Sequence, residues 1–243
     1  MTTAPTPLHR RHAAHRSQLA LVAVLLLALI ALAIVLIRYD VFGGSSSSST
    51  VQGSGVAATQ TRELQNFSSV ELSGSNNVVV HVGGKQSVVV HADDNLLRYV
   101  TTQVQADKLT IGNTSGSFTT NSTMSVDVNV PSLEALTLTG SGVITATGIK
   151  VSSLMVRLSG NGVLRASGSA TRLDVSLGGS GDAQLEQLVA RDVRAVVSGS
   201  GRILVSATNS LDAAVPGSGA IVYSGNPAHV TTSITGTGAV TAG

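Results

Sequence analysis

Residues 154–166 read LMVRLSGNGVLRA, and this stretch decides the fold. Its apolar side chains recur at every second position on both sides of a Gly-Asn-Gly turn: Leu154, Val156 and Leu158 before it, Leu164 and Ala166 after it. A period of two is typical of half-buried β-strands and not of helices. The stretch therefore predicts two half-buried strands joined by a tight turn.

The same pattern occurs six times between residues 132 and 243. The first glycines of consecutive turns are 20, 19, 20, 18 and 19 residues apart, and a period of this length indicates a solenoid. The fold class expected is all-β: a right-handed parallel β-helix with 18–20-residue coils, the hand following the usual crossover of parallel strands. The glycines of the six turns are Gly140, Gly142, Gly160, Gly162, Gly179, Gly181, Gly199, Gly201, Gly217, Gly219, Gly236 and Gly238.

Parallel stacking also predicts which side chains lie above one another. If coils stack in register at about 4.8 Å, equivalent positions form columns on the outer walls. Opposite charges that are stacked in such a column contribute about 0.2–1 kcal/mol per pair. The column five residues before each first glycine contains Ala135, Met155, Asp174, Arg194, Asp212 and Thr231.

The turn glycines admit two interpretations. Successive backbone N–H groups can bind phosphate, but no helix is expected after the turns and no Lys-Ser/Thr pair completes a P-loop. A tight coil corner that needs a positive φ explains the glycines without a ligand, and this interpretation is favoured. Residues 178–182 also resemble a calcium-binding repeat, but Asp182 falls one position early and the other turns lack it.

Charge and cysteine content exclude several classes of protein. The chain is basic, with a pI near 9.3, because Arg10, Arg11, Arg16 and Arg38 surround an apolar segment. Residues 43–243 contain 11 of the 15 Lys and Arg and 12 of the 13 Asp and Glu, so this part of the chain is nearly neutral. No basic stripe is present, so no nucleic-acid partner is expected. The absence of cysteine excludes disulfides, thiolate metal sites and a lipidated cysteine anchor.

The N-terminal region predicts a membrane anchor. Residues 1–17 are basic and are expected to form a cytoplasmic tail. Residues 18–37 carry no charge, and about 20 helical residues span a hydrocarbon layer of roughly 30 Å, so a transmembrane signal anchor that contacts the lipid bilayer is predicted. The alternative is a cleaved signal peptide, whose apolar region is normally about 7–15 residues and ends in a small-residue site that residues 37–42 lack.

Everything after the anchor is expected outside the cytoplasm. Residues 38–58 are rich in Gly and Ser and predict a flexible linker. Residues 59–243 predict the β-helix ectodomain, in which Gly74-Ser75-Asn76 is an early, degenerate copy of the turn. Additional strands are expected at residues 86–92, 99–105, 107–112 and 124–130. The predicted location is the cytoplasmic membrane, with a single pass and a cytoplasmic N-terminus.

From about Arg62 to the end, the chain resembles a family of bacterial envelope proteins, the auto-transporter adhesins with a head GIN domain. The resemblance is carried by residues 66–70 (NFSSV), 86–90 (QSVVV), 93–97 (DDNLL), 109–112 (LTIG) and 128–136 (VNVPSLEAL). It implies a right-handed parallel β-helix on an exported protein and an adhesin-like role. The family offers no catalytic or ligand residues to carry over. The predicted anchor departs from the signal peptide or lipoprotein cysteine expected in such a protein.

No assembled catalytic site is expected. Glycoside cleavage normally needs two facing carboxylates, but the only adjacent acids, Asp93 and Asp94, would point to opposite sides of an extended strand. A Ser-His-Asp triad could draw on His81, His91 or His229, yet no nucleophile elbow occurs. The sequence thus predicts a protein that is not an enzyme and has no catalytic, cofactor-binding or metal-binding residues.

The function expected is a non-catalytic, adhesin-like binding module at a bacterial cell envelope. Long, regular solenoid walls suit contacts with a cell-wall glycan or a surface protein. The alternative is a self-associating structural or scaffold protein. In that case an uncovered C-terminal coil would pair with another copy and form a homo-oligomer.

Overall fold

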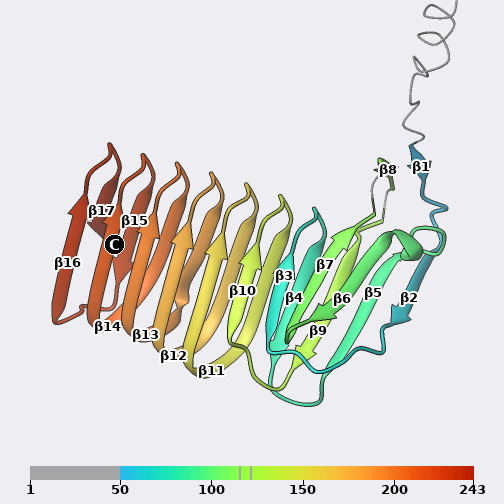
Figure 1. Cartoon of the computed structure of the whole chain (residues 1–243), viewed down its shortest axis with the longest axis horizontal. Coiled ribbons are helices and arrows are strands. Elements are labelled where there is room, and N and C mark those ends of the chain that lie inside the picture. The colour runs from blue at the N-terminus through green and yellow to red at the C-terminus, as the bar shows by residue number, and fades with distance from the viewer. Residues whose placement is uncertain (1–49, 115, 121) are drawn as a thin grey trace, which may run out of the picture. The chain divides into compact units, whose positions relative to one another are not determined.

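The computed structural model describes residues 50–114, 116–120 and 122–243, and this part of the chain forms an all-β fold without an α-helix (Figure 1). Fifteen of its strands form one sheet, and β1 and β8 form a small second one. The elements are β1 (Val51–Gln52), β2 (Ala57–Thr61), β3 (Ser69–Leu72), β4 (Asn77–Val82), β5 (Ser87–Asp93), the 3-10 helix η1 (Leu97–Tyr99), β6 (Val100–Gln105), β7 (Lys108–Asn113), β8 (Phe118–Thr119), β9 (Ser125–Val130), β10 (Ala135–Leu138), β11 (Val143–Leu158), β12 (Val163–Leu177), β13 (Asp182–Val197), β14 (Arg202–Val215), β15 (Ala220–Ser224), β16 (His229–Ile234) and β17 (Ala239–Ala242).

Strands β11 to β14 confirm the predicted β-solenoid. Each is 14 to 16 residues long, begins just after one Gly-x-Gly turn and ends just before the next. Successive strands pair in parallel, and register shifts near the middle of each pair mark the place where the strand changes direction. The two strands expected per coil are therefore the two halves of one bent strand.

The two corners of a coil differ in how constant they are. At the Gly-x-Gly corner, Leu158 and Val163 are five positions apart, as are their partners Leu177 and Asp182 on the next coil. At the opposite corner, the separation between the flanking buried residues varies. It is eight positions from Ala146 to Leu154, seven from Ala166 to Leu173 and six from Val205 to Leu211. This second corner absorbs the variation of the period between 18 and 20 residues.

The predicted outer column is confirmed by the strand register. Met155 pairs with Ala135 on one side and Asp174 on the other, and Arg194 lies between Asp174 and Asp212. Thr231 completes the column on β16. The ion pairs found among the described residues lie elsewhere; the one between coils of the C-terminal half joins Arg202 Nε and Asp182 Oδ1 at 3.6 Å, on the other wall.

The core consists of the inward-facing residues of successive coils. Every second residue of the paired halves is buried, as at Leu154, Val156 and Leu158. The last coil is the exception, because β16 pairs only with β14 and β17 only with β15. At its inward positions, the side chains of Val230 and Ile234 are 43% and 47% exposed.

The N-terminal coils are not stacked in chain order. The degenerate turn at residues 74–76 joins β3 and β4, as expected, but these strands pair on their outer side with β7 and β9, which come later in the chain. On the other side β3 pairs with β10 and β4 with β11. The coil of β3 and β4 therefore lies between two later coils.

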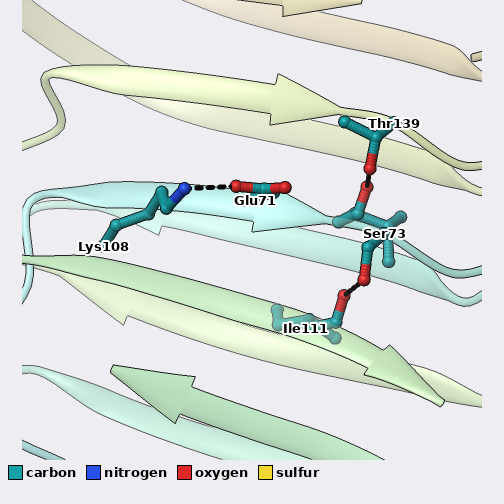
Figure 2. A network of polar contacts seen from close by, with 6 residues as sticks. Glu71, Ser73, Lys108, Ile111 and Thr139 are labelled. Carbon is teal, nitrogen blue, oxygen red and sulfur yellow. Dashed lines mark hydrogen bonds and ion pairs between the residues drawn. The ribbon is translucent and has the colours of Figure 1, made fainter. Parts of the chain in front are cut away.

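Polar contacts join the three coils that meet at β3 (Figure 2). Lys108 Nζ on β7 lies 2.6 Å from Glu71 Oε2 on β3, a diagonal contact, because the register pairs Lys108 with Ser69 and Glu71 with Thr110. The Ser73 hydroxyl donates to the carbonyl of Ile111 at 3.2 Å, and the Thr139 hydroxyl donates to that of Leu72 at 3.4 Å.

Antiparallel strands complete the N-terminal end of the solenoid (Figure 1). Strand β6 pairs with β7, β5 with β9 and β2 with β5, all antiparallel. Strands β5, β6, β7 and β9 correspond to the four additional strands predicted from the sequence. Antiparallel pairing here ends the row of parallel coils, so the folded unit is not a solenoid throughout.

The compact unit spans Ser49–Gly243 and so begins earlier than the predicted boundary at residue 59. Val51 and Gln52 pair with β8, and Ala57 and Ala58 begin β2, although the Gly/Ser content of residues 38–58 predicts a linker. The predictions for residues 1–17, 18–37 and 38–49 lie outside the described residues. Within the described part of the chain, no helix has the length and apolar character needed to cross a membrane.

Candidate functional site

The twelve turn glycines form two columns along the Gly-x-Gly corner of the solenoid. A Cβ atom on any of them would lie only 1.9–2.3 Å from the carbonyl oxygen of the equivalent residue on the coil before it. At Gly160, for example, the contact would be with Gly140 at 1.9 Å. Only glycine lets the backbones approach this closely, so these residues set how the corner stacks.

The expected reason for these glycines, a positive φ, is wrong. None of the twelve has φ in the left-handed region. Within residues 132–243 the positive φ values fall at the second corner instead, at Gly148, Gly168, Gly225 and Asn226. Close approach between coils, not local backbone conformation, is what excludes a side chain at the Gly-x-Gly corner.

Backbone amides of most turns bond the neighbouring coil. Ser200 N and Gly201 N both donate to the carbonyl of Gly179, at 3.1 and 3.2 Å, and Gly181 N donates to Gly160 at 3.3 Å. Five of the six turns thus use N–H groups to bond the coil before them, and after the Gly160-Asn161-Gly162 turn Val163 N donates to the carbonyl of Gly142 at 3.1 Å. The side chains at the turn tips remain exposed, and they are hydroxyls or an amide: Ser141, Asn161, Ser180, Ser200, Ser218 and Thr237.

Asn76 stands where the degenerate turn lacks its second glycine. It is 3% exposed, and its amide exchanges hydrogen bonds of 2.9 and 3.3 Å with the amide of Asn113. The neighbouring coil of β7 and β9 has no Gly-x-Gly turn, so there is room here for two side chains. The sequence alone offers no signal for this amide pair. The pair forms because the coil of β7 and β9 lies next to that of β3 and β4, although it comes later in the chain.

The residues considered for catalysis do not form a triad. Asp192, Ser210 and His229 occupy neighbouring positions on β13, β14 and β16. The Ser210 hydroxyl donates directly to Asp192 Oδ1 at 2.7 Å, so the carboxylate does not orient a histidine. Hydrogen bonds from Asn209, the larger effect, and from Ser210 lower the pKa of Asp192 below its ordinary value of 3.8.

The other two histidines lie on the wall formed by β4, β5 and β9. His91 Nε2 is 3.0 Å from Asp127 Oδ2, and His81 Nδ1 is 2.9 Å from the hydroxyl of Thr147. Neither histidine has a nucleophilic serine placed between it and an acid. Among the described residues, no three acids, histidines or cysteines gather as a metal site, and Asp182 faces Arg202.

Asp93 and Asp94 point in different directions, as their adjacency predicts. Asp93 is fully buried, whereas Asp94 is exposed and accepts a hydrogen bond from the Ser54 hydroxyl. The Thr120 hydroxyl donates to Asp93 Oδ2 at 2.8 Å, and Gly55 N donates at 3.3 Å. Hydrogen bonding from Ser122 and Thr120 lowers the pKa of Asp93 below 3.8, against the opposing effect of burial. This carboxylate holds the segment before β2 against the sheet.

The surfaces available for binding are the outward halves of the strands. On the wall before each turn, Arg157, Arg172, Asp174, Arg194 and Asp212 are exposed. The wall after each turn carries Thr145, Arg165 and Gln184 in one registered row, and Arg165 Nε donates to Gln184 Oε1 at 3.0 Å. A hollow of about 210 Å³ lies beside this row.

These features define a parallel β-solenoid. Its regular outer walls, and not an enclosed cavity, form the main surface available for binding. The chain belongs to the family described as "Putative auto-transporter adhesin, head GIN domain", which matches residues 66–227. The resemblance noted in the sequence is thereby confirmed.

Solved structures share the fold. A "putative adhesin" from Bacteroides fragilis NCTC 9343 is 22% identical and has a TM-score of 0.63, with 79% of this chain and 99% of that chain covered. A "putative lipid binding protein" from Parabacteroides distasonis ATCC 8503 is also 22% identical, with a TM-score of 0.53 and coverages of 80% and 100%. Among curated proteins, none matches this chain.

Proposed function

We propose that the protein is a membrane-anchored, extracytoplasmic, non-catalytic binding module of adhesin-like function at a bacterial cell envelope. Membership of an adhesin-described family supports this role. Residues 18–37 would hold it in the cytoplasmic membrane, with residues 1–17 in the cytoplasm and the β-solenoid outside. We further propose that the solenoid is right-handed, in keeping with the usual crossover of parallel strands.

The observation that carries this proposal is the regularity of the outer walls. Charged and polar side chains recur in register from coil to coil, as in the column of Asp174, Arg194 and Asp212. An extended polymer can contact several coils of such a wall at once, and weak contacts then add up. The turn glycines contribute by stacking the coils, not by binding.

Co-sedimentation tests the proposal. The unit Ser49–Gly243 would be mixed with isolated cell-wall sacculi and, separately, with intact bacterial cells. Saturable binding that unlabelled protein displaces is the expected result. Alanine substitutions at the exposed Arg157, Arg165 and Arg194 would then locate the wall responsible. No binding to either target, by a protein that remains folded, would overturn the proposal.

A second candidate function is self-association as a structural protein of the envelope. It is favoured by the exposed Val230 and Ile234 and by the unpaired outer edges of β16 and β17. Residues 228–243 carry no Asp, Glu, Lys or Arg, the charges that commonly protect an edge strand from pairing. Sedimentation velocity over a range of concentrations distinguishes the two. A monomer at every concentration would exclude self-association, and Ile234→Lys should abolish any oligomer that does form.

A further inference from the structure

The coil that contains Ser167 is shorter at its second corner than the coils on both sides of it. Between the registered pairs Ala146–Ala166 and Ile149–Gly168, residues 147–148 on one coil are matched by Ser167 alone. On the other side, residues 166–167 are matched by the three residues 185–187. A short corner between two longer ones leaves a recess in the wall.

The hollow of about 210 Å³ lies at this recess. Ala146 and Ala166 contribute to its lining and are almost fully buried, at 1% and 4% exposure, so its innermost part is apolar. The side chains around them are polar and come from three successive coils: Thr145, Thr147, Arg165, Ser167, Gln184 and Glu186.

The hydrogen bond between Arg165 Nε and Gln184 Oε1 orients the polar side of the hollow. This bond uses the Nε–H of Arg165 and one lone pair of the Gln184 amide oxygen. The two terminal NH₂ groups of the guanidinium and the NH₂ of Gln184 therefore remain as donors. Glu186 supplies acceptors, and the hydroxyls of Thr145 and Ser167 can donate or accept, whereas that of Thr147 already lies 2.9 Å from His81 Nδ1. Arg165 and Glu186 carry opposite charges, so the lining has no net charge.

We propose that this hollow binds one sugar unit of a neutral glycan chain. A neutral polyhydroxylated ligand can pair with both donors and acceptors. An anion would meet Glu186, a cation would meet Arg165, and an apolar ligand would leave the polar groups unpaired. The volume is below the roughly 300–1,000 Å³ typical of pockets for drug-sized ligands, which suits a single ring with its neighbours outside. The inference rests on the proposed function, because it names the ligand class of that binding module.

Binding by the full-length chain to defined oligosaccharides tests the inference. The probes are chitotetraose and maltotetraose, which are neutral, and dextran sulfate, which is anionic; sacculi and intact cells serve as the natural targets. Arg165→Ala removes the central donor, and Ser167→Leu fills the recess. Arg202→Ala is the matched control, because Arg202 lies on the same wall outside the hollow. Thermal unfolding of each variant checks that the fold is intact.

Both hollow variants should weaken binding to a neutral probe by about tenfold or more, Arg165→Ala through the loss of a good hydrogen-bonded contact and Ser167→Leu because its side chain occupies the space. Arg202→Ala should change the affinity less than about twofold. Chitotetraose and sacculi as the preferred targets would support a wall glycan, and maltotetraose with cells a surface polysaccharide. Binding to dextran sulfate alone would overturn the inference. So would wild-type affinity of both variants for every target, although that result would leave the proposed function standing. Failure of the wild-type chain to bind any target would overturn both.

Discussion

A Cβ atom placed on Gly179 would lie 2.1 Å from the carbonyl oxygen of Gly160, its counterpart on the preceding coil. The preceding residue, Gly178, has a different environment: its Cβ would meet nothing closer than the Ser198 hydroxyl at 3.7 Å. Two adjacent glycines of one turn thus differ in whether a methyl group fits.

We expect Gly179→Ala to destabilise the fold by about 1–3 kcal/mol, the usual cost of overpacking a close contact. Gly178→Ala should change the free energy of unfolding by less than about 0.5 kcal/mol, since φ at this position is not positive and the space is open. Urea denaturation of both variants measures the difference. Equal effects of the two substitutions would mean that close stacking is not what requires Gly179.

Much of the solenoid could be predicted because its rules are local and repeated. The two-residue period gives the inward and outward faces, and the spacing of the turns gives the register that places Asp174 beside Arg194. The coil order at the N-terminal end could not be predicted in this way. Strands β7 and β9 lie outside β3 and β4 because of pairings between distant segments, and no periodicity within one segment encodes such pairings.

The candidate site was less accessible from the sequence. The glycine columns are evident from the repeat, but the contact that requires glycine lies between coils, and a local rule on φ gave the wrong cause. The hollow beside Ser167 depends on a difference of one residue between neighbouring corners. That difference is present in the spacing of 20, 19 and 20 residues, but only the register shows which corner absorbs it.

The uncovered last coil predicts unequal effects at equivalent inward positions. Leu177 is 1% exposed and Ile234 is 47% exposed, although each lies two residues before the first glycine of its turn. Leu177→Ala should cost about 2–5 kcal/mol of unfolding free energy through the cavity it leaves. Ile234→Ala should cost at most about 1.5 kcal/mol, because half of the side chain is already in water. Thermal denaturation at low protein concentration measures both, and a large effect at Ile234 would show that this residue is covered in solution.

The amide pair of Asn76 and Asn113 predicts an energetic coupling between distant segments. Asn76→Ala leaves the half-buried amide of Asn113 without its partner and should cost about 0.5–1.5 kcal/mol. The double variant Asn76→Ala/Asn113→Ala should cost less than the sum of the single variants, because both remove the same interaction. Asn161→Ala, at an exposed turn tip, is the control and should be nearly neutral. Strict additivity in a double-mutant cycle would contradict the pairing.

The buried carboxylate of Asp93 predicts a pH-dependent stability. Because its pKa in the folded protein lies below the ordinary value of 3.8, the fold stabilises the ionised form. The contribution of Asp93 to the unfolding free energy is complete above about pH 3.8 and is lost as the pH falls through the folded pKa. Asp93→Asn should therefore be less stable than the wild type at pH 7, with the difference narrowing below pH 3.8. Thr120→Val, which removes one hydrogen-bond donor, should show a smaller pH-dependent difference of the same sign. Urea unfolding of the unit Ser49–Gly243 across this pH range measures all three proteins, and parallel profiles for Asp93→Asn and the wild type would refute a stabilised carboxylate at this position.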